Sequence, residues 1–184
     1  MRIKLSNIRY KRFLLILIFI LSLGSQSSNA LAEYKIDEIV SLYKFLHSNP
    51  ELSWQEDKTA GYLADILESE GYEVTRGVGE KGVVAILKNG KGPTLMIRAD
   101  MDALPVEEKT NLEYASKVRQ INRFGEEVPV MHACGHDIHM SVLIGTAKNL
   151  ISLKNKWSGT LMLILQPAEE VGQGSLAMLE DGLF

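Results

Sequence analysis

Residues 160–170 read TLMLILQPAEE, an almost wholly apolar run that ends at Gln166-Pro167 and is followed by two adjacent acids, Glu169 and Glu170. A short apolar run without polar alternation is typical of a strand covered on both faces, as in α/β proteins. Adjacent carboxylates repel each other, so a pair at a strand end indicates either a functional site or a solvated helix start. The stretch therefore predicts a buried strand with two acids at its carboxyl end.

The segments on either side of this strand alternate between helical and strand patterns. Such alternation predicts an α/β fold, here a three-layer sandwich with helices on both faces of one sheet. Residues 105–130 are polar and irregular, and we expect a long loop there. The expected helices cover residues 34–47, the segment after Glu56, residues 136–153 and a stretch from residue 174; the expected strands cover residues 72–75, 83–87, 94–98 and 160–165.

Two helices allow more detailed expectations. The stretch Ser53-Trp54-Gln55-Glu56 fits a capping box, with Ser53 as N-cap and Glu56 reaching back to it. In the helix over residues 136–153, helical spacing points one set of apolar residues inward. This set is Val142, Leu143, Ala147 and Leu150. His47, Trp54 and Trp157 are expected to have structural roles.

A second acidic pair follows another expected strand, in the stretch RADMDALP from Arg98 to Pro105. Asp100 and Asp102 are two residues apart, so they point the same way if the backbone is extended. Such a pair suits a metal ligand, or a carboxylate that orients a histidine ligand. A solvated turn is the alternative.

A third cluster, HACGHDIH at residues 132–139, holds three of the four histidines of the chain and its only cysteine. Thiolate and imidazole are preferred ligands of zinc and similar metals. The cluster therefore predicts a metal site. Cys134 and His136 point the same way if the segment is extended, whereas His136 and His139 share a face if a helix has begun. A buried cysteine beside a hydrogen-bonded histidine is the alternative.

The N-terminus predicts export. Residues 1–32 contain five basic residues and no acid, with a short apolar run at residues 13–23 and a small-residue end at Ala30-Leu31-Ala32. These features are typical of a secretory signal peptide, and a membrane anchor through residues 13–23 is the alternative. Without this segment, 15 Lys and Arg face 23 Asp and Glu, a net charge of −8. Such an acidic chain is a poor candidate for nucleic-acid binding.

Together and in this order, the three clusters and the stretch LHSNPELS at residues 46–53 resemble the amidohydrolase branch of the aminoacylase/carboxypeptidase metallopeptidase family. This branch includes hippurate hydrolases, auxin-conjugate hydrolases and N-acetyldiaminopimelate deacetylases. The resemblance covers the chain from about Leu46 to Phe184. It implies a zinc-peptidase type of sandwich, two divalent metal ions (zinc or manganese, with cobalt or nickel as alternatives) and hydrolysis of N-acyl amino acids or similar small amides.

The resemblance also implies roles for individual residues. Cys134 and His136 correspond to metal ligands, with Cys134 bridging the two ions, and Glu170 corresponds to a third ligand. Glu169 corresponds to the general base. Asp102 corresponds to an aspartate that orients a ligand. Asp100 stands where the wider family has a histidine ligand, so it is not assigned. No substrate-binding residue is predicted.

Relatives of this family are roughly twice as long, with further histidine ligands and a smaller lid domain that contributes to substrate binding and dimerisation. We therefore expect residues 33–184 to form the N-terminal part of the catalytic domain, with weak or no activity, one bound ion and an exposed apolar sheet edge. A homodimer or a separate C-terminal half are the expected partners. The alternatives are a non-catalytic remnant that binds a metal or a partner, and a redox protein that uses Cys134.

Overall fold

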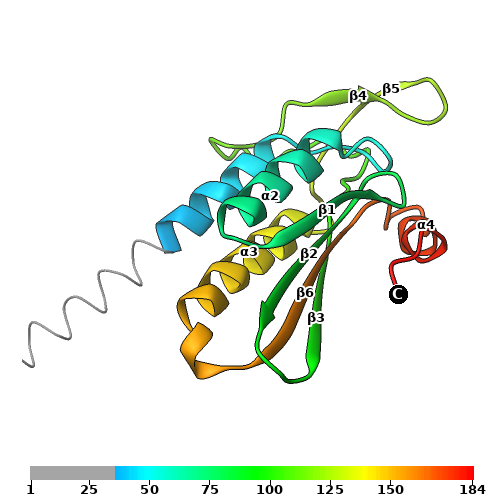
Figure 1. The fold of residues 1–184 in the computed structure, drawn as a ribbon. Helices are drawn as coiled ribbons and strands as arrows, with labels where there is room; N and C mark the ends of the chain where they lie inside the picture. Colours follow the sequence, from blue (N-terminus) through cyan, green and yellow to red (C-terminus); the bar gives the residue numbers. More distant parts are fainter. Residues whose placement is uncertain (1–35) are drawn as a thin grey trace, which may run out of the picture. The chain divides into compact units, whose positions relative to one another are not determined.

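The computed structural model describes residues 36–184, so the expected signal peptide at residues 1–32 lies outside the described residues. A first helix covers residues 36–48. No helix in the described part of the chain is long and apolar enough to cross a membrane. The remaining elements (Figure 1) are α2 (Asp57–Ser69), β1 (Glu73–Val78), β2 (Gly82–Asn89), β3 (Thr94–Asp100), β4 (Arg119–Ile121), β5 (Glu127–Pro129), α3 (His136–Ser152), a 3-10 turn (Lys154–Lys156), β6 (Gly159–Gln166) and α4 (Gly174–Glu180).

The main sheet has the strand order β1-β2-β6-β3. The apolar strand β6 is antiparallel to β2 and parallel to β3, so it lies inside the sheet with a neighbour on each side. Its side chains alternate between the two faces, and both faces are covered. This explains why β6 has almost no polar residue.

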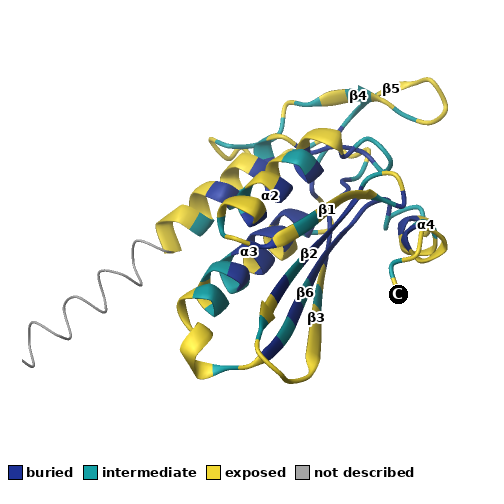
Figure 2. Ribbon diagram, viewed as in Figure 1, coloured by how far each residue is buried: buried dark blue, intermediate teal, exposed yellow. Residues whose placement is uncertain are grey.

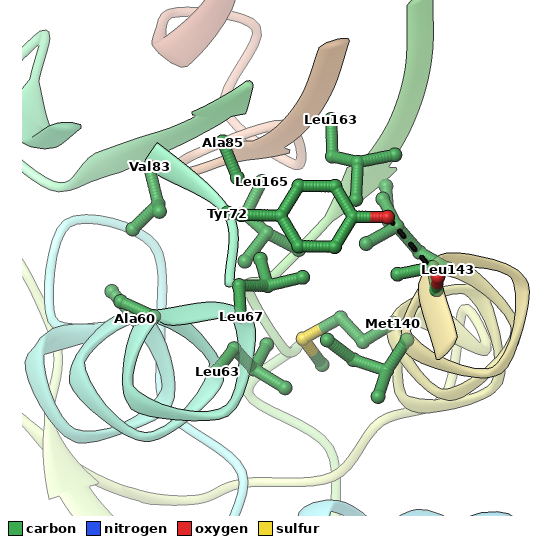
Figure 3. Packing of buried hydrophobic residues seen from close by; sticks show 14 of the residues in the cluster. Ala60, Leu63, Leu67, Tyr72, Val83, Ala85, Met140, Leu143, Leu163 and Leu165 are labelled. Atoms are coloured by element: carbon green, nitrogen blue, oxygen red, sulfur yellow. Dashed lines mark hydrogen bonds between the residues drawn. The ribbon is translucent and has the colours of Figure 1, made fainter. Parts of the chain in front are cut away.

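Helices α2 and α3 cover one face of the sheet and α4 covers the other (Figures 1 and 2). Leu163 and Leu165 of β6 belong to the larger core together with Leu67 of α2 and Met140 of α3 (Figure 3). On the opposite face, the fully buried Met178 of α4 packs against Val84 and Ile164. The expected three-layer α/β sandwich is thus confirmed.

Two local predictions were wrong. Ser53 does not cap α2: the helix begins at Asp57, and Glu56 occupies the N-cap position without a side-chain cap hydrogen bond. Both side chains instead bind distant loops, as described below. Val142 is 58% exposed rather than inward, because α3 meets the sheet through Met140, Leu143, Ile144 and Ala147.

The expected loop at residues 105–130 also contains a hairpin, in which β4 and β5 pair antiparallel and apart from the main sheet (Figure 1). Its turn is closed by Asn122, whose Oδ1 accepts the N–H groups of Phe124 and Glu126. Gly125 supplies a positive φ of 83°, which glycine adopts without strain. These turn contacts account for a hairpin in a segment with little apolar alternation.

Candidate metal centre

The topology brings the three chemical clusters together at one end of the sheet. Strands β3 and β6 are parallel, and Asp100 lies opposite Gln166 where both strands end. The acids that follow each strand are therefore neighbours. Helix α3 begins at His136 beside them. Ligands in open α/β sheets bind at this carboxyl edge.

Asp102 links the clusters. Its carboxylate is fully buried and accepts hydrogen bonds from Ser53 Oγ at 2.6 Å, from the backbone N–H of Glu169 at 3.1 Å and from that of Glu170 at 3.0 Å. Burial favours the neutral acid, but hydrogen bonds from His136, Ser53 and these two N–H groups outweigh it, so the pKa of Asp102 lies below its usual range. A charged Asp102 thus holds the loop that carries both glutamates.

The same residue orients His136. Nδ1 of His136 lies 2.8 Å from the backbone carbonyl oxygen of Asp102. A carbonyl oxygen can only accept, so Nδ1 carries a proton and donates it there. Nε2 is then the ring nitrogen available to a ligand. It faces Asp100 Oδ2 at 3.8 Å, Glu169 Oε2 at 3.8 Å and Glu170 Oε1 at 3.9 Å.

These carboxylates also change the acidity of the ring. Burial alone would lower the pKa of His136, but hydrogen bonds to Asp102 and the negative charges of Asp100 and Asp102 raise it to about 9. The pocket therefore favours a positive charge at Nε2. A divalent cation bound at Nε2 would supply that charge in place of the proton.

Cys134, His136 and Glu170 form a three-donor group whose ligand atoms lie within 4.8 Å of one another. Oε1 of Glu170 is buried without a hydrogen-bond partner among the described residues. A hydrogen bond to Glu170, burial and the nearby negative charges raise the pKa of the exposed Cys134 thiol. Sulfur, nitrogen and oxygen donors around one point fit a zinc-like cation, which would also satisfy the unpaired carboxylate oxygen.

A second group consists of Asp100, His136 and His139, with ligand atoms equally close. Both groups need Nε2 of His136, so they cannot hold two ions at once through that nitrogen. Asp100 is also engaged by an ion pair with Arg98. The group with Cys134 and Glu170 is therefore the stronger candidate.

Glu169 differs from Glu170 in its access to solvent. Its side chain is 40% exposed, whereas that of Glu170 is 17% exposed. The less exposed carboxylate suits a ligand, and the more exposed one suits proton exchange with a substrate and water.

Glu56 has a role that the sequence did not indicate. It is completely buried, and its Oε1 accepts the backbone N–H of Ala168 at 2.8 Å. Ala168 has a φ of 49°, in the left-handed region, directly before the two glutamates. Burial raises the pKa of Glu56 to about 7, although backbone hydrogen bonds oppose this rise. The two residues are 112 positions apart in the chain, so the contact becomes apparent only in the folded structure.

Two further histidines lie close to the cluster. His47 contacts Asp137 Oδ2 through Nδ1 at 2.6 Å and Glu108 Oε1 through Nε2 at 3.0 Å, so it joins the first helix, a loop and the start of α3. This agrees with the structural role expected for it. His132 is buried, its ring nitrogens have no hydrogen-bond partner in residues 36–184, and burial lowers its pKa to about 4.

Comparison with known proteins identifies the family to which this chain is similar. A model of peptidase family M20/M25/M40 matches residues 96–184. The chain is 47% identical to hippurate hydrolase of Campylobacter jejuni over 140 residues, which are 76% of this chain and 34% of that protein. It is 44% identical to thermostable carboxypeptidase 2 of Saccharolobus solfataricus over 152 residues, 80% of this chain and 36% of that protein.

A solved structure supports the same assignment. The YXEP protein of Bacillus subtilis, described as a dinuclear metal-binding peptidase of the M20 family, matches with a TM-score of 0.73 and 39% identity. The match covers 82% of this chain and 40% of that one. The chain thus spans well under half the length of these relatives. The family resemblance inferred from the sequence is confirmed.

Proposed function

Because the chain shares the sequence pattern and the fold of peptidase family M20/M25/M40, we propose that it forms part of a metal-dependent hydrolase for N-acyl amino acids or similar small amides. The observation that carries the proposal is the meeting of Cys134, His136 and Glu170 beside the open carboxylate of Glu169. The relatives support the substrate class, since hippurate is an N-acyl amino acid.

Cys134, His136 and Glu170 would hold one divalent ion, and zinc and manganese are our first candidates. When bound, such an ion would polarise the amide carbonyl and make a nearby water more acidic. A second ion, as in the dinuclear relative, requires donors beyond this group.

Glu169 would act as the general base and acid. Its carboxylate accepts a proton from the attacking water and returns it to the nitrogen of the leaving amine. Asp102 would position both the base and the metal ligands. Its carboxylate accepts the backbone N–H groups of Glu169 and Glu170, and its carbonyl oxygen accepts a hydrogen bond from His136. We further propose that the protein acts outside the cytoplasm, on the strength of its basic and apolar N-terminus.

A matched pair of variants tests this proposal. The purified chain is loaded with zinc or manganese, its metal content is measured, and hydrolysis of a panel of N-acyl amino acids is followed. Glu169→Gln should keep the metal and lose turnover by about 10²- to 10⁴-fold, the usual contribution of a general base. Glu170→Gln should lose metal as well as activity.

Other outcomes would redirect the proposal. Metal binding by the parent chain without turnover would favour a non-catalytic metal-binding protein, which is consistent with a group of only three donors in the described residues. Full activity of Glu169→Gln would exclude Glu169 as the base.

A further inference from the structure

A cavity of about 410 Å³ lies next to the candidate metal centre, and Glu170 is one of its lining residues. Small-molecule sites usually measure roughly 300–1,000 Å³, so the cavity is large enough for a ligand. Four separate segments converge on it: residues 52–55, residues 103–105, residues 122–124, and the stretch that contributes Glu170, Val171 and Gln173. Two of them, through Ser53 and Glu170, also belong to the hydrogen-bond network of Asp102.

The walls of this cavity are mainly apolar, with Trp54, Leu104, Phe124 and Val171 among them. A dry cavity of only about 150 Å³ can hold a benzene ring, so an aromatic or branched group fits here. Trp54 has a φ of 68°, which is unfavourable for a bulky residue, and its Nε1 donates to Gln173 Oε1 at 3.1 Å. The backbone of Trp54 is thus strained beside the cavity, and such strain is common at ligand sites.

The outer wall comes from the tip of the β4–β5 hairpin. Arg123 is the only cation among the described residues that line the cavity, and its guanidinium lies 4.9 Å from the centre of the Phe124 ring. Two hydrogen bonds anchor the hairpin to the segment before α2: Leu52 N to Gln120 Oε1 at 2.8 Å and Gln55 Nε2 to Ile121 O at 2.9 Å. The hairpin therefore presents one positive charge and one aromatic ring to an apolar cavity.

We propose that this cavity binds the amino-acid half of the substrate and selects amino acids with a bulky apolar side chain. This inference rests on the proposed function, because the scissile amide must lie near Glu170. The apolar side chain packs among Trp54, Leu104 and Phe124. The free carboxylate of the amino acid faces Arg123, whose planar guanidinium suits a carboxylate.

Binding can be measured without catalysis. The full chain with Trp157→Phe and Glu169→Gln leaves Trp54 as its only tryptophan and removes the proposed base. Zinc-loaded protein is titrated with N-acetyl-L-phenylalanine, N-acetyl-L-phenylalaninamide and N-acetylglycine while tryptophan fluorescence is recorded. We expect N-acetyl-L-phenylalanine to bind at least about tenfold more tightly than N-acetylglycine and to change the Trp54 signal. Calorimetry on the protein with native Trp157 gives the same comparison if Trp157→Phe does not fold.

Point variants separate the two contacts. Phe124→Ala should weaken binding of both phenylalanine ligands by about fivefold or more, because an apolar contact is lost. Arg123→Gln should lower the affinity for N-acetyl-L-phenylalanine to that for its neutral amide. It should leave the affinity for the amide unchanged. Phe184→Ala, which removes an exposed aromatic ring (79% exposed) that does not line this cavity, is the control and should change neither affinity.

The outcomes distinguish this inference from the proposed function. Equal affinities for N-acetylglycine and N-acetyl-L-phenylalanine, or no effect of Phe124→Ala, would overturn the inference even if the chain hydrolyses N-acyl amino acids. Selective binding that depends on Phe124 and Arg123 would support the inference even if the protein with native Glu169 shows no turnover. The absence of turnover would count against the proposed function alone.

Discussion

At the scale of single residues, Glu56 couples the stability of the fold to pH. Its carboxyl has a pKa of about 7 in the folded chain, against an ordinary value of 4.5. The folded state therefore retains a proton that the unfolded chain releases. The stability that this group contributes is fully present below about pH 4.5 and is lost as pH rises to about 7, with no further loss above that.

The variant Glu56→Gln tests this coupling, because glutamine cannot ionise but keeps an oxygen that can accept the Ala168 N–H. We expect the variant to gain stability relative to the parent chain as pH rises from 5 to 8. Thermal melts at the two pH values give the difference in Tm between variant and parent. The control is Glu73→Gln, a change at an exposed position. A difference in Tm that is the same at both pH values would contradict the role of Glu56.

At the scale of elements, the first residue of α4, Gly174, determines how close the loop that carries Glu169 and Glu170 lies to the helix. A Cβ atom on Gly174 would lie 1.6 Å from the backbone oxygen of Pro167. Gly174 N also donates to Ala168 O at 3.2 Å, so the loop from Pro167 to Gln173 closes against the helix start. Any side chain at residue 174 must displace this loop and, with it, Glu169 and Glu170.

Gly174→Ala should therefore destabilise the fold by about 1–3 kcal/mol, as overpacking usually does, and should weaken zinc binding. Gly61→Ala is a matched control, since its Cβ has no atom within 4 Å and it lies inside α2. That change should stabilise the chain by up to about 1 kcal/mol, because alanine favours helix. Urea unfolding and zinc titration measure both effects. Unchanged zinc affinity in Gly174→Ala would show that the loop position does not control the site.

At the scale of the whole molecule, the main sheet has an open edge. Strand β3 pairs with β6 on one side and with no other strand of the described residues on its second side. Its residues Leu95 and Met96 are exposed by 59% and 46%. An unpaired apolar edge is a template for pairing with another chain. This agrees with the open edge expected from the sequence.

Met96→Lys should reduce self-association, because a charged edge residue opposes pairing between copies. Light scattering at increasing protein concentration measures the effect, and circular dichroism checks that the fold is retained. Leu176→Lys changes another exposed apolar residue, on α4 (57% exposed), and should leave association almost unchanged. If both variants associate alike, association depends on general hydrophobicity rather than on the β3 edge.

Much of the fold could be predicted because the relevant signals are local. The apolar run of β6 indicated a strand covered on both faces, and helical spacing located α2 and α3. Local signals failed where a distant contact competed with a local one. Ser53 and Glu56 have the spacing of a capping box, yet they bind Asp102 and Ala168, which are 49 and 112 residues away in the chain.

The sequence by itself determined the class of fold and the residue types available at the candidate site, because strand patterns and clusters of such residues are properties of short segments. Only the tertiary structure decided which of these segments meet. The position of β6 between β2 and β3 places Asp102 beside the two glutamates, and the hairpin brings Arg123 and Phe124 to the cavity. These arrangements depend on packing between segments far apart in the chain, and no local pattern encodes such distances.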